Sequence, residues 1–256
     1  PPNLRRLPPA QRASLKGLMP HQAEFSSPMA GRWLRILQSS EPDSPQTVDA
    51  LSALIRSRAM CRSFLPDPVA PSIIREIVDL GTRAPSAGRS QGLHVVQLTG
   101  DEREQMWSRS LPGDRREGFA FPGLIEAPVL LLLFVDPDAY VERYAESDKA
   151  HTGLGNGRGE WRTPFWFVDA GMAAMSMLLA AEAYELGALF FAVPQPEDDI
   201  RSALGVPESQ ATVGVLALGY RNDDDRQSRG VGRSATRPRR GADDVIHRGQ
   251  WQQRPR

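Results

Sequence analysis

A run of eight residues, Pro128 to Val135, constrains the fold of this 256-residue chain more than any other segment. After the proline it reads Val-Leu-Leu-Leu-Leu-Phe-Val, so an extended backbone is apolar on both of its faces. Successive side chains of a strand point to opposite faces, and a strand that is apolar on both needs cover on both. The run therefore predicts the central strand of a sheet with helices on each side.

Periodicity and turn residues predict the other elements. The expected helices begin at an N-cap Thr47, at Pro71 and at Asp169. The third is the strongest, running to Leu186 with Gly187 as its C-cap. A short helix is expected at 197–204, and further strands at 93–98, 188–193 and 212–219. This order favours an α+β fold, an α-β-α sandwich whose mainly antiparallel sheet is flanked by helices.

Composition excludes several classes of protein. The formal net charge is zero, which argues against nucleic acid as a partner. The one cysteine, Cys61, rules out an intrachain disulfide; it is either a buried packing thiol or a thiol made reactive by its arginine neighbours. With no signal pattern and no apolar run near the length of a membrane span, we expect a cytoplasmic protein without a membrane partner.

The chain divides into two parts by composition. Residues 1–46 are rich in Pro, Arg, Ser and Gln and predict a partly ordered extension, while 47–256 carry the folded domain. Within the domain, the polar and glycine-rich segment 136–163 predicts a lid-like excursion, and 221–256 predicts a C-terminal arm.

Two short motifs carry the functional prediction. The first is Arg58-Ala59-Met60-Cys61-Arg62-Ser63-Phe64, and the second is Ala84-Pro85-Ser86-Ala87-Gly88-Arg89-Ser90-Gln91-Gly92-Leu93-His94. Together they resemble the nitroreductase family of FMN enzymes, whose hallmarks are an RRSxRxF-like run followed by an APSxxNxQPW-like run. A third segment, Arg237 to Trp251, resembles the family's closing segment. The resemblance covers residues 47 to 251 and implies an intertwined homodimer.

The resemblance also implies roles for individual residues. Arg58, with Ala59 and Met60 beside it, would hold the FMN phosphate together with Arg237 and Arg239. Arg62 would approach the pyrimidine edge of the flavin, where positive charge stabilises the reduced anion. The backbone at Ala192 and Val193 would face flavin N5.

The second motif would come from the partner subunit, with Pro85, Ser86, Ala87 and Arg89 at the flavin. Here the sequence departs from the family pattern. Met60 replaces a hydroxyl residue, Arg89 an asparagine, Gly92 a proline and Leu93 a tryptophan. Arg89 would contact either the flavin carbonyls or the phosphate of a nicotinamide cofactor, and NADPH is slightly favoured over NADH for this reason.

The predicted function is an NAD(P)H-dependent, nitroreductase-type oxidoreductase that takes hydride onto flavin N5 and reduces nitroaromatic or quinone-like acceptors by a ping-pong mechanism. No side chain is expected to act as a catalytic group, since the flavin does the chemistry, and no metal site is expected. Five aromatic residues near the excursion are candidates for a small-molecule acceptor pocket: Phe119, Phe121, Trp161, Phe165 and Trp166. The alternatives are a flavin-sequestering protein without catalysis, and a family variant that performs reductive dehalogenation or flavin breakdown.

Overall fold

The computed structural model describes residues 45–223 and 236–252. Nearly all of the expected extension 1–46 lies outside these ranges. The chain forms two compact units, 1–53 and 54–256, so their boundary falls inside the helix α3 (Pro45–Ser57). This helix is confirmed, but it begins two residues before the expected N-cap Thr47.

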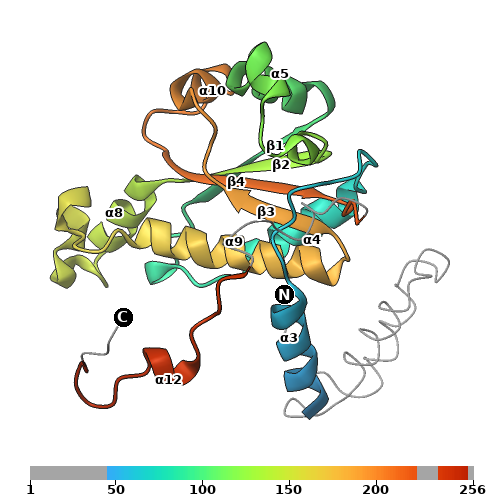
Figure 1. Cartoon of the computed structure of the whole chain (residues 1–256). Helices are drawn as coiled ribbons and strands as arrows, with labels where there is room; N and C mark the ends of the chain where they lie inside the picture. Colours follow the sequence, from blue (N-terminus) through green and yellow to red (C-terminus); the bar gives the residue numbers. More distant parts are fainter. Residues whose placement is uncertain (1–44, 224–235, 253–256) are drawn as a thin grey trace, which may run out of the picture. The chain divides into compact units, whose positions relative to one another are not determined.

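A four-stranded antiparallel sheet with the order β1-β2-β4-β3 organises the second unit (Figure 1). Its strands are β1 (Leu93–Thr99), β2 (Val129–Val135), β3 (Gly187–Phe191) and β4 (Ala211–Gly219). All four lie where the sequence predicts strands. The α-β-α sandwich is confirmed.

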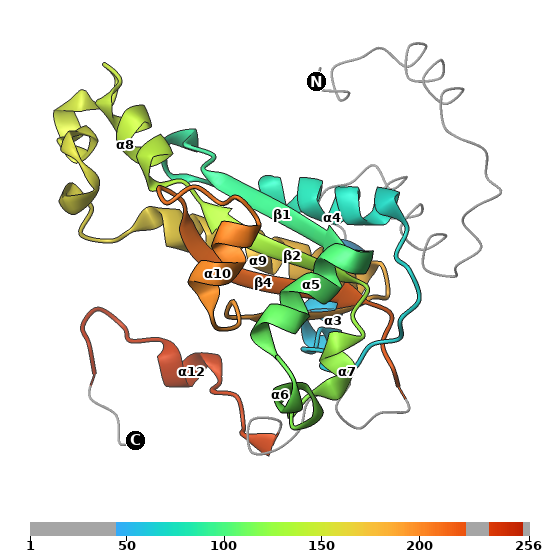
Figure 2. The ribbon, with the colours of Figure 1, turned by 90° about the horizontal axis from the view of Figure 1, so that it is seen from above.

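Helices cover both faces of the sheet (Figures 1 and 2). On one face lie α5 (Gly100–Ser110) and α10 (Glu197–Ala203), and on the other lie α4 (Pro71–Thr82) and α9 (Phe165–Ala183). Short helices α6 (Asp114–Glu117) and α7 (Pro122–Ile125) follow α5, α8 (Pro137–Ala145) follows β2, and α12 (Ala242–Val245) lies in the C-terminal segment.

The central strand β2 is buried along its whole length. Its even-numbered residues Leu130, Leu132 and Phe134 join the core cluster beneath α5 and α10. Its odd-numbered residues Val129, Leu131 and Leu133 join the cluster beneath α4 and α9. The alternation explains why the sequence shows no polar position here: these six side chains enter one of two cores, and Val135 joins a third cluster with Tyr140 and Trp161.

Helix α9 is the longest element, and three expectations about it need correction. It begins at Phe165, four residues before Asp169, and ends at Ala183 rather than Leu186. It has 19 residues and a mean hydropathy of 1.3, so by length and composition alone it passes as a membrane span, against the expectation of no such run. Half of that stretch is buried inside the fold, as in a core helix.

The end of α9 is a Schellman motif built without glycine. Leu186 N–H donates to the Ala181 carbonyl (2.9 Å) and Glu185 N–H donates to the Glu182 carbonyl (3.0 Å). Glu185 occupies the left-handed position, with φ +60°. The expected cap Gly187 instead opens β3, where an added Cβ would lie 2.8 Å from the Cys61 sulfur.

We predict that Glu185→Gly stabilises the protein by about 1 kcal/mol, because glycine has no Cβ to oppose a left-handed backbone. Glu185 is exposed, so little packing is lost. The measurement is the midpoint of urea unfolding. Glu142→Gly, at an exposed interior position of α8, is the matched control and should destabilise by a similar amount. A lower midpoint for Glu185→Gly would contradict this account of the cap.

Candidate functional site

The first motif runs along the outer edge of β3. Met60 forms a parallel bridge with Ala188, and Cys61 N–H donates to the Ala188 carbonyl at 2.8 Å. Cys61 is fully buried and donates its S–H to the Ser63 carbonyl, and burial raises the pKa of its thiol. The packing role of Cys61 is therefore the one that the structure supports, and the residues on either side of it remain half-buried.

Arg58 carries an unsatisfied charge. Its Nε and Nη1 atoms are inaccessible and have no hydrogen-bond partner within the described ranges. A buried guanidinium without an acceptor is costly, and a phosphate is the acceptor that its planar donors fit best. The residues present therefore fit an anionic group such as the FMN phosphate. Arg62 lies over the ring of Phe121, 5.7 Å from its centroid, and is held there by a cation–π contact.

The second motif forms a tight loop, residues 85–92, that leads into β1. Three of its residues have left-handed backbones: Gly88 (φ +60°), Arg89 (φ +60°) and Gln91 (φ +53°). Asparagine tolerates this region better than arginine does, so the arginine at 89 adds strain at this position. Within the loop, Ser90 Oγ donates to the Ala87 carbonyl (2.7 Å) and Gln91 N–H to Ser86 Oγ (3.2 Å).

Two side chains outside the motif also hold the loop, and the sequence analysis missed both. Arg143 on α8 donates through Nε to the Gly88 carbonyl at 2.8 Å. Asp169 on α9 accepts the Ala87 N–H at 2.7 Å. For Asp169 a signal was present: it is the one charged residue among the first seventeen of a helix that is otherwise apolar, and a buried carboxylate needs a partner.

The two motifs lie at opposite corners of the sheet. The loop enters β1 at Leu93, which pairs with Val135 at one end of β2. Met60 meets β3 at Ala188, which aligns through Leu218 with Val129 at the other end of β2. The sheet order makes β1 and β3 the two edges. From strand geometry the corners are about 20 Å apart along the strands and about 14 Å across them.

The five aromatic residues predicted to line an acceptor pocket fall into two groups. Phe119 and Phe121 contact each other (6.1 Å between ring centroids), and Phe119 also contacts Trp107, in the core beneath α5. Trp161 and Trp166 are buried with Tyr140 in a third cluster, where the excursion packs on the start of α9. Phe165 contacts Trp161 but is 41% exposed. The structure thus does not gather the five around one cavity of this subunit.

Of the four remaining predicted residues, three are exposed and one is buried. Ala192 is exposed and Val193 is buried, just after β3. Arg237 and Arg239 are exposed in the C-terminal segment, where their part in phosphate binding stays a prediction.

The excursion 136–163 is folded. After α8 it makes three 3-10 turns, at 150–152, 154–156 and 158–160. Two ion pairs join residues within it: Arg143 to Asp148 (2.8 Å) and Arg158 to Asp138 (2.7 Å). The same two arginines also donate to carbonyls outside it, those of Gly88 and Ser209. The hydrogen bonds from these arginines hold the pKa values of Asp148 and Asp138 below their usual range.

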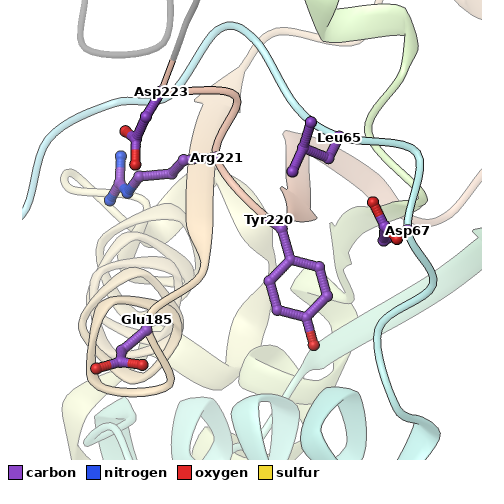
Figure 3. A pocket seen from close by; sticks show the side chains of 6 residues that line it. All are labelled: Leu65, Asp67, Glu185, Tyr220, Arg221 and Asp223. Carbon is purple, nitrogen blue, oxygen red and sulfur yellow. The ribbon is translucent and has the colours of Figure 1, made fainter.

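Two hollows stand out in the part of the chain that is described. The larger, about 490 Å³, is an open depression beside the end of α9, lined by Leu65, Asp67, Glu185, Tyr220, Arg221 and Asp223 (Figure 3). Its guanidinium, on Arg221, is already paired with Glu182, and none of the predicted site residues lines it. The smaller, about 300 Å³, is lined by Pro85, Ser86, Tyr140 and Asp169 among others. The second hollow is therefore the one that bears on function.

Residues 55–220 match the model of the nitroreductase family. The chain belongs to the nitroreductase family. No group of three or more His, Cys, Asp or Glu side chains in the described ranges could hold a metal ion.

Relatives of this nitroreductase-family chain include enzymes and solved structures. It is 29% identical over 187 residues to a protein named NADH dehydrogenase from Thermus thermophilus, covering 68% of this chain and 87% of that one. Its fold is similar to that of an NADPH:FMN oxidoreductase from Vibrio harveyi complexed with NAD+ (TM-score 0.57, 22% identity, 80% and 79% of the chains). A nitroreductase family protein from Streptococcus pneumoniae is also similar (TM-score 0.57, 19% identity, 77% and 99%).

We predict that acid releases the excursion before the sheet unfolds. A carboxyl group whose pKa is lowered by folding stabilises the folded form above its ordinary pKa, and this contribution is lost as pH falls through the lowered value. Below about pH 4 the ion pairs of Asp138 and Asp148 should therefore weaken. The expected result is a red shift of tryptophan emission, from exposure of Trp161, at a pH where the far-ultraviolet circular dichroism is still native.

The control is the double variant Asp138→Asn, Asp148→Asn, which should show the shifted emission already at neutral pH. An emission that changes only together with the circular dichroism would contradict a separate release of the excursion.

Proposed function

We propose that this protein is an FMN-dependent NAD(P)H oxidoreductase that reduces nitroaromatic or quinone-like acceptors. The observation that carries the proposal is the half-buried Arg58 beside the outer edge of β3, whose Nε and Nη1 atoms are inaccessible and have no acceptor among the residues that the structure describes. Membership of the nitroreductase family supports FMN as the group that supplies this acceptor through its phosphate.

In this proposal the first motif and two C-terminal arginines bind different parts of that cofactor. Arg58 holds the phosphate, with Ala59 and Met60 forming the adjacent backbone and Arg237 and Arg239 closing the clamp. Arg62, steadied by Phe121, presents positive charge to the pyrimidine edge and so favours the reduced form. When bound, FMN supplies the redox chemistry, accepting hydride from NAD(P)H and passing two electrons to the acceptor in alternating half-reactions.

In this proposal the second motif contributes residues to the flavin site of another subunit. A single chain separates the two motifs by the length and width of its sheet, so one subunit does not bring Pro85, Ser86 and Ala87 to the cofactor held by its own Arg58. A homodimer resolves this separation. Helix α9 offers a surface for it, because five large apolar side chains are 37–42% exposed along it: Phe165, Phe167, Val168, Met172 and Met175.

The acceptor pocket is then built from two subunits as well. Phe119 and Phe121 lie on the side of Arg62, while Phe165 lies near the start of α9, close to the cluster that contains Trp161 and Trp166. A planar acceptor between these two groups would have aromatic walls from both chains. This arrangement accounts for the division of the five residues within one subunit.

The first test is the visible spectrum of the purified protein, loaded with FMN, before and after anaerobic NADPH and then NADH. We expect paired flavin bands that bleach with at least one of the two donors. Arg58→Ala should weaken FMN binding by about two orders of magnitude, since a buried charge-assisted contact is lost. Arg83→Ala, which removes an exposed arginine paired with Asp79, is the matched control and should bind FMN normally.

The outcomes separate the candidates. Flavin bands that persist with both donors would favour a flavin-sequestering protein. Two departures from the family motif support this alternative: Met60 in place of a hydroxyl residue and Arg89 in place of an asparagine. A protein that binds no FMN would overturn the proposal. Bleaching followed by reduction of halogenated but not nitro or quinone compounds would move the activity to reductive dehalogenation.

We further propose that Arg89 favours NADPH over NADH. Arg89 is exposed at the tip of the loop, where its guanidinium is accessible to the 2′-phosphate. Arg89→Ala should raise KM for NADPH about tenfold and leave KM for NADH within about twofold, as expected for one lost charged contact. Steady-state kinetics with both donors measure this, and Arg89→Lys controls for charge. Equal changes with both donors would contradict the assignment and point to a flavin contact.

A further inference from the structure

Asp169 is a buried carboxylate inside an apolar helix. Its residue is 6% exposed, and its neighbours on the same face of α9 are Trp166, Ala170 and Ala173. One oxygen, Oδ2, accepts two hydrogen bonds: from the Ala87 N–H at 2.7 Å and from the Tyr140 hydroxyl at 2.9 Å. A single atom therefore joins the loop 85–92, the helix α8 and the helix α9.

A buried carboxylate needs hydrogen-bond donors, because without them it is strongly destabilising in a core. The two donors provide compensation only while both keep their positions. Tyr140 is itself fully buried, and burial together with the bond to Asp169 raises the pKa of its hydroxyl, so it stays a donor at neutral pH. The arrangement is consequently stiff, because moving Ala87 leaves the buried carboxylate with one donor, Tyr140, instead of two.

The loop needs this stiffness. Its left-handed residues Gly88, Arg89 and Gln91 hold a conformation that side chains disfavour, and such backbones persist only where surrounding contacts fix them. Arg143 fixes the outer side through the Gly88 carbonyl, and Asp169 fixes the inner side through the Ala87 amide. Both contacts are partly buried, and of the two side chains Asp169 is the one that is buried.

We propose that Asp169 is a positioning residue that fixes the loop 85–92 for flavin binding and, through Tyr140, couples this loop to the excursion. The proposal rests on the proposed function, because it assigns the loop to a flavin site. Asp169 touches neither flavin nor substrate in this scheme. It acts through the backbone of Ala87, which follows the loop residues Pro85 and Ser86.

The experiment compares Asp169→Asn, Asp169→Leu and Tyr140→Phe in the full chain. Asparagine keeps an oxygen that can accept both hydrogen bonds, whereas leucine keeps the bulk and accepts none. Glu182→Leu is the matched control, since it removes a half-buried carboxylate from the far end of the same helix, where it pairs with Arg221. The readouts are hydrogen exchange in a peptide that covers the Ala87 amide, the Kd for FMN, and the absorbance bands of bound flavin.

With Asp169→Leu we expect exchange at Ala87 to rise at least tenfold and FMN to bind about tenfold more weakly, with shifted flavin bands. Asp169→Asn should restore both properties to within about threefold of the parent, and Tyr140→Phe should lie between. Glu182→Leu should lower the melting temperature without changing either property.

Unchanged exchange at Ala87 in Asp169→Leu and in Tyr140→Phe would overturn the anchoring. Faster exchange with unaltered FMN affinity and unaltered flavin bands would leave Asp169 a purely structural residue, which also overturns the proposal. A parent protein that binds no FMN would instead sink the proposed function, while the exchange results would still decide whether Asp169 holds the loop.

Discussion

The structure depends on burying β2 on both of its faces. Six apolar side chains enter two cores alternately and the seventh, Val135, joins a third cluster; together their burial contributes on the order of 10–20 kcal/mol. The strand is apolar on both faces, so it needs cover on both. A polar residue at any of its positions would be buried. This constraint explains the two layers of helices, the central place of β2 in the sheet, and the long apolar helix α9 that covers one face.

The length of β2 also sets the distance between the two sequence motifs. Its seven residues separate the corner that carries Arg58 from the corner that carries the loop 85–92, and the order of strands adds the full width of the sheet. A cofactor held by both motifs therefore requires two copies of the chain. Helix α9 serves both needs, since one side packs on the sheet and the other exposes apolar side chains. In the proposed homodimer, core packing and assembly are in this way joined in one element.

Sequence patterns predicted the strands and the helices α4 and α9, because these elements bury periodic or continuous apolar residues. Helix α5 was missed since it buries few apolar residues, chiefly Met106 and Trp107; its signal was the capping box of Thr99 and Glu102. The C-terminus of α9 was misplaced because Glu185 takes a position that usually holds glycine. The motifs located the candidate site, but the contact of Ala87 with Asp169 joins residues 82 positions apart, and no local pattern encodes such a pair.

One departure from the family motif, Gly92, has a local explanation in the fold. At Gly92 an added Cβ would lie 2.7 Å from the Asp136 carbonyl oxygen, while the Asp136 N–H donates to the Gly92 carbonyl at 2.8 Å. The close approach of two backbones, where β1 begins and the excursion starts, thus requires glycine here. Gly92, Arg143 and Tyr140 all connect the loop to the same excursion. Because the loop is held mainly through its backbone, its shape depends less on the side chains of the motif than on these contacts, and this is how it keeps its conformation with arginine at position 89.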